Sequence, residues 1–156
     1  METFFQEHIL LAGHRKHPVT QEFLRMREAG AVPDLSLLEK ERVILLRPEF
    51  MLAQRVNNYL DKKQVILQNT VYTTNASTAL NLTAENYGFC FVNETGIHSA
   101  PHQEDLAFFY FDTEDMVHPL SAVYKKKSYL IPAARRFIDL MLEYYKSLSH
   151  GHEAPR

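Results

Sequence analysis

Two short polar segments contain the residue types that could bind a small anion. Arg47-Pro48-Glu49-Phe50 follows one apolar run, and Thr73-Thr74-Asn75-Ala76-Ser77 follows the next. Guanidinium, hydroxyl and amide groups, together with the free N–H groups that begin a helix, form a common anion site. Thr74, Asn75 and Ser77 can equally well serve only to cap the helix that follows. Both interpretations stay open, because one residue can do both.

Patterns of catalytic or metal-binding residues are missing elsewhere. None of the five glycines is spaced as in a phosphate-binding loop or a dinucleotide fingerprint. His98 and His102 have the spacing of a helical metal pair, but Pro101 interrupts it, and no Cys, Asp or Glu stands at ligand spacing around them. Cys90 lies between two phenylalanines, which predicts a buried structural thiol rather than a nucleophile. We therefore expect no catalytic residues, no metal and no cofactor, and a chain that is not an enzyme.

The elements that must position the two polar segments alternate between strands and helices. Strands are expected at 8–12, 42–46, 65–73, 89–92, 106–111 and 120–126, and helices at 21–29, 50–61, 76–87 and 129–146. The run from Arg42 to Leu46 is typical of a buried parallel strand. Strand–helix–strand–helix–strand order predicts a three-layer α/β fold, a parallel-type sheet with flanking helices. In such a sheet both polar segments lie at carboxyl ends of strands, where ligands bind.

The length and the net charge of the chain disfavour several classes of protein. A chain of 156 residues fits one compact domain or two small ones. Seventeen basic and nineteen acidic residues give a net charge of −2, which disfavours a surface for nucleic acid. No apolar run approaches the ~18 residues that span a membrane, and the N-terminus lacks the pattern of a secretory signal. With a single cysteine, these features predict a cytoplasmic protein without a membrane partner.

Four stretches of the chain occur in an order and spacing typical of one protein family. They are Glu7 to Gly13 followed by His17-Pro18, Asp34 to Leu46, Ala79 to Val92, and Ala122 to Lys126 followed by Tyr129 to Asp139. These stretches resemble the effector-binding domain of LysR-type transcriptional regulators, and the likeness extends over residues 7–146. The resemblance implies a fold similar to type 2 periplasmic binding proteins.

The resemblance also implies a domain organisation. Residues 13–121 would be regulatory subdomain II, and residues 1–12 and 122–148 would be the hinge strands and C-terminal helix of subdomain I. Residues 149–156 are expected to form a disordered tail. The family's helix-turn-helix domain and the first half of subdomain I would precede residue 1. We therefore expect the apolar residues of the C-terminal helix, which include Phe137, either to self-associate or to form an exposed patch.

The effector site that the resemblance implies consists of the two polar segments. Its residues would be Arg47, Pro48, Glu49, Phe50, Thr73, Thr74 and Asn75. The effector would be a small polar or anionic metabolite that modulates DNA binding by a helix-turn-helix domain absent from this chain. The chain is expected to form a homo-oligomer and to reach DNA only through that missing domain. The alternative functions are a stand-alone cytoplasmic solute-binding protein and a small enzyme on the same fold.

Overall fold

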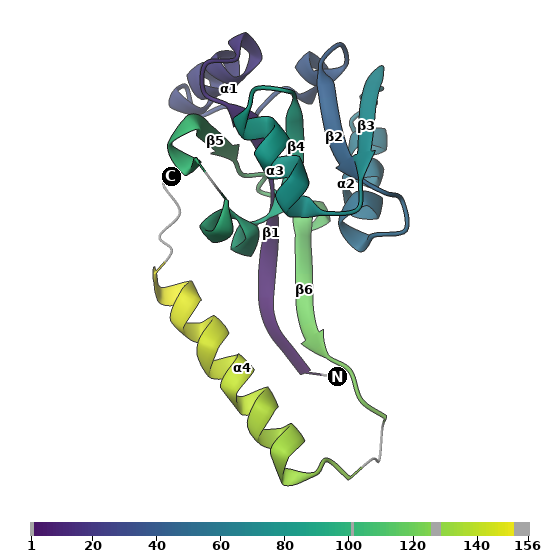
Figure 1. Ribbon diagram of the computed structural model, residues 1–156, viewed down its shortest axis with the longest axis vertical. Helices are drawn as coiled ribbons and strands as arrows, with labels where there is room; N and C mark the ends of the chain where they lie inside the picture. The colour runs from purple at the N-terminus through teal and green to yellow at the C-terminus, as the bar shows by residue number, and fades with distance from the viewer. Residues whose placement is uncertain (1, 101, 126–128, 152–156) are drawn as a thin grey trace. The chain divides into compact units, whose positions relative to one another are not determined.

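The computed structural model describes residues 2–100, 102–125 and 129–151 (Figure 1). The chain divides into two compact units, residues 8–118 and residues 1–7 with 119–156. Both divisions fall within strands, which also contain the predicted subdomain boundaries at residues 13 and 121. The assignment of the units to regulatory subdomains II and I stays a prediction.

The larger unit is built on a mixed sheet with the strand order β3-β2-β4-β1-β5, and β6 pairs with β1 outside this order. The strands are β1 (Glu2–His14), β2 (Arg42–Leu46), β3 (Asn69–Thr73), β4 (Phe89–Asn93), β5 (Leu106–Phe109) and β6 (Val117–Ala122). β2 is parallel to β3 and β4, as the alternation of strands and helices predicts. β1 is antiparallel to β4 and β5, so the sheet is not parallel throughout. An apolar run such as 9–12 predicts burial of a strand but not its direction.

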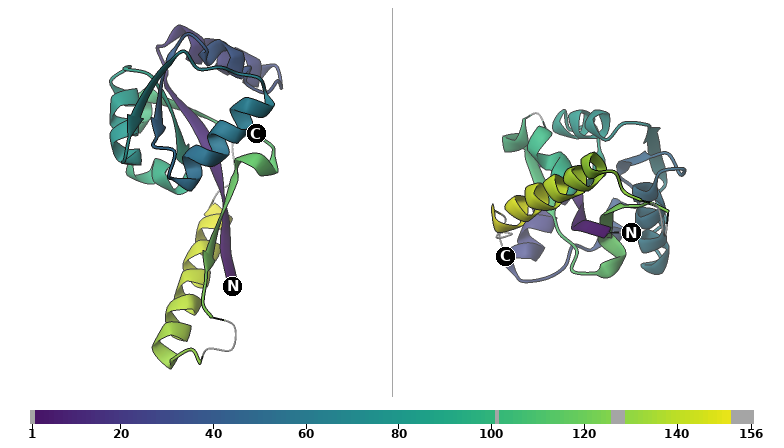
Figure 2. Two further views of the ribbon diagram at one scale, coloured as in Figure 1. Left: turned by 90° about the vertical axis from the view of Figure 1, so that its right-hand side faces the viewer. Right: turned by 90° about the horizontal axis from the view of Figure 1, so that it is seen from below.

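Helices cover both faces of this sheet (Figure 2). They are α1 (Pro18–Glu28), α2 (Met51–Lys62) and α3 (Ala76–Ala84). Side chains of α1 and α2 share one apolar core with residues such as Val43 and Phe91, whereas α3 shares a second core with Ile44 and Cys90. Neighbouring residues of one strand point to opposite faces, so the two cores lie on the two sides of the sheet. The predicted three-layer α/β architecture is confirmed.

Two elements end earlier or begin later than the apolar pattern predicts. β3 begins at residue 69 instead of 65, because the residues after α2 first form the C-terminal cap of that helix. In this cap Gln64 has φ 58°, and the Val65 N–H donates to the Leu60 carbonyl at 3.0 Å. α3 likewise ends at residue 84 instead of 87, where Asn86 has φ 56° and the Tyr87 N–H donates to Leu82. Bonds of this kind satisfy the last carbonyls of a helix.

Close backbone contact fixes the turn between α3 and β4. A Cβ atom on Gly88 would lie 2.5 Å from the Arg42 carbonyl oxygen. Glycine is therefore required there, because a backbone atom cannot give way to a side chain. After β4 the chain forms two short 3-10 turns, at Glu94–Ser99 and Gln103–Asp105.

The smaller unit contains the first half of β1, the end of β6 and α4 (Pro132–Gly151). The hydroxyls of Thr3 and Ser121 are 2.9 Å apart, and the rings of Phe5 and Tyr145 stack at 5.3 Å. α4 includes residues 149–151, which were expected to be disordered, because Gly151 is the first glycine after Pro132.

Some sequence predictions at this end of the chain fall outside the described residues. These are the tail at 152–156 and the end of the strand expected at 120–126. That strand is shifted toward the N-terminus, since β6 covers residues 117–122. Among the described residues, no helix is long and apolar enough to cross a membrane.

Candidate functional site

The two predicted polar segments meet at one edge of the sheet. β2 and β3 are parallel and in register, with Leu46 opposite Thr73, so the loops that follow both strands begin side by side. The N–H of Arg47 donates to the carbonyl of Thr73 at 3.0 Å and joins the two loops directly. The sheet therefore brings both segments to the carboxyl edge, as the predicted topology requires.

The first loop leaves the start of α2 without a side-chain cap. Phe50 occupies the N-cap position, and its side chain makes no cap hydrogen bond. Arg47 is paired with Glu49 instead, with 3.0 Å between Nε and Oε1, and both side chains are more than half exposed. The carbonyl of Pro48 accepts a hydrogen bond from the Gln54 side chain at 3.2 Å. The first amides of α2 thus have no side-chain cap among the described residues, and such amides can bind a negative group.

The second loop caps its own helix. Asn75 Oδ1 accepts hydrogen bonds from the N–H groups of Ser77 and Thr78 at 2.8 and 3.4 Å. Thr73 Oγ1 in turn accepts the N–H of Asn75 at 3.2 Å, and Thr74 is exposed. The capping interpretation therefore describes Asn75 in this structure. The Asn75 side chain, for which capping and anion binding were both open, satisfies the amides at the start of α3.

A pocket of about 330 Å³ lies at this edge of the sheet. It is lined by Leu46, Phe50, Met51, Leu52, Ala76, Ser77, Leu80, Val92, Asn93, Thr95, Gly96 and His118. Among the predicted site residues Phe50 lines the pocket, whereas Arg47 to Glu49 and Thr73 to Asn75 do not. The walls are mostly apolar side chains with a few hydroxyl, amide and imidazole groups. A pocket of this volume and character suits a small organic molecule.

Part of the pocket wall was missed by sequence reasoning. Asn93 ends β4, and its Oδ1 is buried without a hydrogen-bond partner among the described residues. The rule that selected the ends of β2 and β3 would also have selected Asn93, because β4 is the third parallel strand. His118, at the start of β6, follows from no motif and reaches the pocket only through the fold.

A buried carboxylate supports the segment after β4. Glu94 is 8% exposed and accepts hydrogen bonds from the His8 N–H and the Tyr110 hydroxyl, each at 3.3 Å. Burial, and then the charge of Glu94, raise the pKa of Tyr110 to about 12. The hydrogen bond from Tyr110 thus helps to hold Glu94, the residue next to Asn93, in place.

The two other groups considered for chemistry lie apart from this pocket's lining. Cys90 is fully buried, as predicted, and burial raises the pKa of its thiol to about 12. His102, Glu104 and Asp105 bring possible ligand atoms within 4.8 Å of one another. The expectation that no Asp or Glu stands at ligand spacing was wrong here, because the 3-10 turn at Gln103–Asp105 brings both carboxylates back toward His102. The group is largely exposed, and acidic clusters of this kind are common without an ion.

Solved structures share this architecture. The effector-binding domain of QuiR in complex with shikimate matches with a TM-score of 0.67 and 13% identity, over 94% of this chain and 65% of that one. The regulatory domain of CcmR from Synechocystis PCC6803, in complex with 2-PG, matches with a TM-score of 0.67 and 13% identity, over 93% and 66%. The BenM effector-binding domain with benzoate matches with a TM-score of 0.64 and 16% identity, over 99% and 66%. These likenesses show a periplasmic-binding-protein-like fold.

The present chain spans slightly less than two thirds of those three domains. Comparison with curated protein sequences gave no match. The sequence itself matches the LysR substrate binding domain over residues 1–146, which is nearly all of its length. The chain therefore belongs to the LysR substrate-binding-domain family.

Proposed function

We propose that this chain is the effector-sensing part of a LysR-type transcriptional regulator and binds a small metabolite at the carboxyl edge of its sheet. The observation that carries the proposal is the pocket of about 330 Å³, which borders the ends of β2 and β4 and the first residues of α2 and α3. Ligands of open α/β sheets bind at this edge. The proposed function includes no catalytic step.

The lining defines the chemistry of the effector. Leu46, Leu80 and Val92 favour an apolar body, because their surfaces are withdrawn from water when it binds. Asn93 Oδ1 would accept a hydrogen bond from a hydroxyl or amino group of the ligand. The uncapped amides of α2 favour a carboxylate or another anionic group. A small acid with an apolar ring or chain satisfies all three, and relatives solved with shikimate and benzoate support this choice.

The pocket also suggests how binding would be transmitted. His118 lines the pocket and is the last residue of the larger unit, since the smaller unit resumes at Pro119. A ligand that contacts His118 better in one arrangement of the units would shift their populations. We propose that this shift alters DNA binding by a helix-turn-helix domain elsewhere in the regulator. A cytoplasmic location and a homo-oligomeric regulator are parts of the same proposal.

Nuclear magnetic resonance of the ¹⁵N-labelled chain tests the site, with benzoate and shikimate as probes. We expect saturable shifts at amides 51–53 and 93–96. Ser77→Ala should weaken binding by about threefold to tenfold, because a hydroxyl that meets the ligand is lost. Thr78→Ala is the matched control, since Thr78 follows Ser77 on α3 but does not line the pocket. Shifts without saturation, or equal losses in both variants, would contradict the proposed site.

A further inference from the structure

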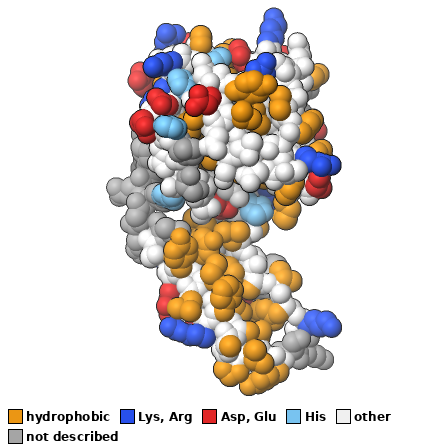
Figure 3. All heavy atoms as spheres, in the orientation of Figure 1, with side chains coloured by type: hydrophobic (Ala, Val, Ile, Leu, Met, Phe, Trp, Pro, Cys, Tyr) orange, Lys and Arg blue, Asp and Glu red, His pale blue; other side chains and the backbone are white. Residues whose placement is uncertain are grey.

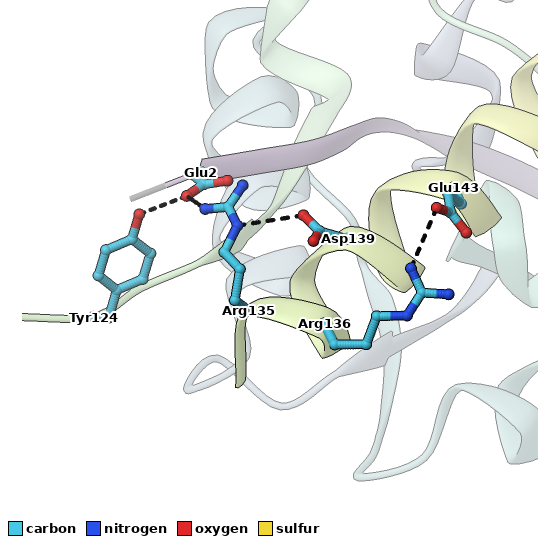
Figure 4. Close-up of polar contacts among 6 residues, drawn as sticks. All are labelled: Glu2, Tyr124, Arg135, Arg136, Asp139 and Glu143. Carbon is cyan, nitrogen blue, oxygen red and sulfur yellow. Dashed lines mark hydrogen bonds and ion pairs between the residues drawn. The ribbon is translucent and has the colours of Figure 1, made fainter. Parts of the chain in front are cut away.

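The charged side chains of α4 that are drawn in Figure 4 are paired within the smaller unit. Arg135 lies 2.8 Å from Glu2 of β1, and Arg136 lies 3.7 Å from Glu143. Phe137 of the same helix is 60% exposed, and hydrophobic side chains are visible over this region of the molecule in Figure 3. This exposed patch is one of the two outcomes that the sequence predicts for α4. The smaller unit thus exposes apolar surface, whereas these charges have partners.

The end of α2 in the larger unit is different, because charged side chains line two hollows there. The first hollow, of about 430 Å³, lies between the end of α2 and residues 112–115, which follow β5. The second, of about 250 Å³, lies between the same end of α2 and residues 32–36. Val32, Tyr59 and Lys63 line both, so the two hollows adjoin. They share no lining residue with the pocket at the carboxyl edge of the sheet.

Contacts within the chain hold the walls of the larger hollow. Lys62 Nζ lies 2.6 Å from Asp115 Oδ1 and connects α2 to the segment after β5. The rings of Tyr59 and Phe111 meet edge to face, with 5.6 Å between their centres. Tyr59 is 6% exposed, so its position is fixed by the core. A ligand that enters walls already in place loses less free energy in ordering them.

Two opposite charges at the larger hollow have no ion-pair partner among the described residues. Lys63 Nζ lies over the Tyr59 ring, 5.6 Å from its centre, and pairs with no described carboxylate. Asp112 is exposed and pairs with no described basic side chain. Thr113 Oγ1 accepts the N–H of Asp115 at 3.4 Å, so its hydroxyl hydrogen can be donated to a ligand. The hollow thus offers a cation, a carboxylate and a hydroxyl donor to one molecule.

We propose that the hollow at the end of α2 is a second ligand site, which takes a zwitterion with a short apolar body, such as an α-amino acid with an aliphatic side chain. The carboxylate of the ligand would bind Lys63 and the Thr113 hydroxyl, and its ammonium group would bind Asp112. The aliphatic side chain would lie against Val32 and Tyr59, which line both hollows. A simple anion fits less well, because it would also meet the carboxylates of this hollow.

The second site is separate from the proposed effector pocket. Met51 lines that pocket and Lys62 lines the hollow, and these two residues lie at opposite ends of α2, about 16 Å apart along the helix axis. A ligand at one site therefore leaves the other site accessible. The second site does not rest on the proposed effector function, and the two proposals can fail independently.

Nuclear magnetic resonance of the ¹⁵N-labelled 156-residue chain tests the second site, with L-leucine as the probe. We expect saturable shifts at amides 34–36, 62–64 and 113–115, and none at amides 93–96 beside the effector pocket. Saturating benzoate should leave the L-leucine shifts unchanged. No saturable shift up to about 10 mM L-leucine, or competition by benzoate for the same amides, would overturn the proposal.

Removal of single charges tests the two ends of the ligand. Lys63→Met and Asp112→Asn should each weaken L-leucine binding by about threefold to fivefold, because each removes one exposed charge that the ligand pairs with. Lys16→Met and Glu114→Gln are the matched controls, since both residues are exposed and line neither hollow. Equal losses in the variants and in their controls would show a general effect of net charge and would contradict the site.

Two analogues of leucine test whether the site requires both charges of a zwitterion. Isocaproate lacks the ammonium group, and isoamylamine lacks the carboxylate. Each should bind at least about threefold more weakly than L-leucine at the same amides, because one charge of the hollow stays unpaired. Isocaproate that binds as tightly as L-leucine would indicate an anion site, and isoamylamine that binds as tightly would indicate a cation site. Either result would overturn the assignment to a zwitterion.

Discussion

The two helices that begin at the carboxyl edge of the sheet start in different ways. α3 begins with Asn75, whose side chain accepts two of the helix's first N–H groups, whereas α2 begins with Phe50, which caps none. Burial compensates α2 for the missing cap, because five of its residues are buried along one side. Two helix starts that look alike in a sequence can therefore differ in function. In one, a side chain of the same chain accepts the first N–H groups, and in the other these N–H groups stay available to a ligand.

Removal of packing from α2 should have the largest effect. Leu60 is 3% exposed in the core that α2 shares with the sheet. Leu60→Ala should lower the free energy of unfolding by about 2–5 kcal/mol, measured by urea denaturation. A loss in the free energy of unfolding below about 1 kcal/mol would show that burial of α2 does not compensate for its missing cap. Asn58→Ala, at an exposed position of α2, is the matched control.

Removal of the cap from α3 should have the next largest effect. Asn75→Ala should cost about 1 kcal/mol in the free energy of unfolding, because two amides lose their acceptor. Cys90 can report on α3 directly, since it is buried beneath that helix with Ala79 and Leu80. Because the Cys90 thiol is fully buried, its alkylation requires opening of the structure around it. The rate of Cys90 alkylation should rise about fivefold with Asn75→Ala. An unchanged rate would show that the Asn75 cap does not stabilise the packing of α3 over Cys90.

A cap added to α2 should close the proposed ligand site. Phe50→Asn should stabilise the chain by about 0.5–1 kcal/mol if the new side chain accepts the first amides of α2. The same change should weaken binding of benzoate, because those amides are no longer free for the carboxylate. Phe50→Leu serves as the control, since it keeps an apolar side chain and adds no acceptor. Stabilisation without weaker binding would place the carboxylate elsewhere in the pocket.

The exposed ion pair of the first loop should have the smallest effect. Arg47→Ala should change the free energy of unfolding by less than about 0.5 kcal/mol, because the Arg47–Glu49 pair is more than half exposed and screened by water. Calorimetric titration of the variant with benzoate shows whether Arg47 leaves Glu49 to meet a ligand. An unchanged affinity would exclude Arg47 from the effector site that the family resemblance implies.

Much of the fold could be predicted because burial leaves a direct pattern in the sequence. The continuous apolar runs of β2 and β4 indicate strands covered on both faces, and both are found in place. The direction of β1 leaves no such pattern, since an apolar run packs equally well either way. The start of β3 was misplaced because Val65 is apolar for another reason, to bury itself after the turn that ends α2.

The candidate site was predictable only where it follows strand ends. Phe50 and the start of α3 were predicted because they follow the carboxyl ends of β2 and β3. Asn93 follows from the same rule, because it ends the parallel strand β4. His118 could not, because its position depends on how β6 returns to β1 across more than a hundred residues of chain. Sequence alone also could not divide capping from ligand binding, since that depends on where the Asn75 oxygen points.

The position of β1 has a mechanical consequence. Its second half is hydrogen-bonded on both sides, with Leu10 paired to Val92 of β4 and Leu11 paired to Phe109 of β5. A force applied along this half of β1 would load both ladders in shear, so that several backbone hydrogen bonds resist at once instead of opening one after another. Such a load on the second half of β1 would thus be shared between two neighbouring strands of the larger unit.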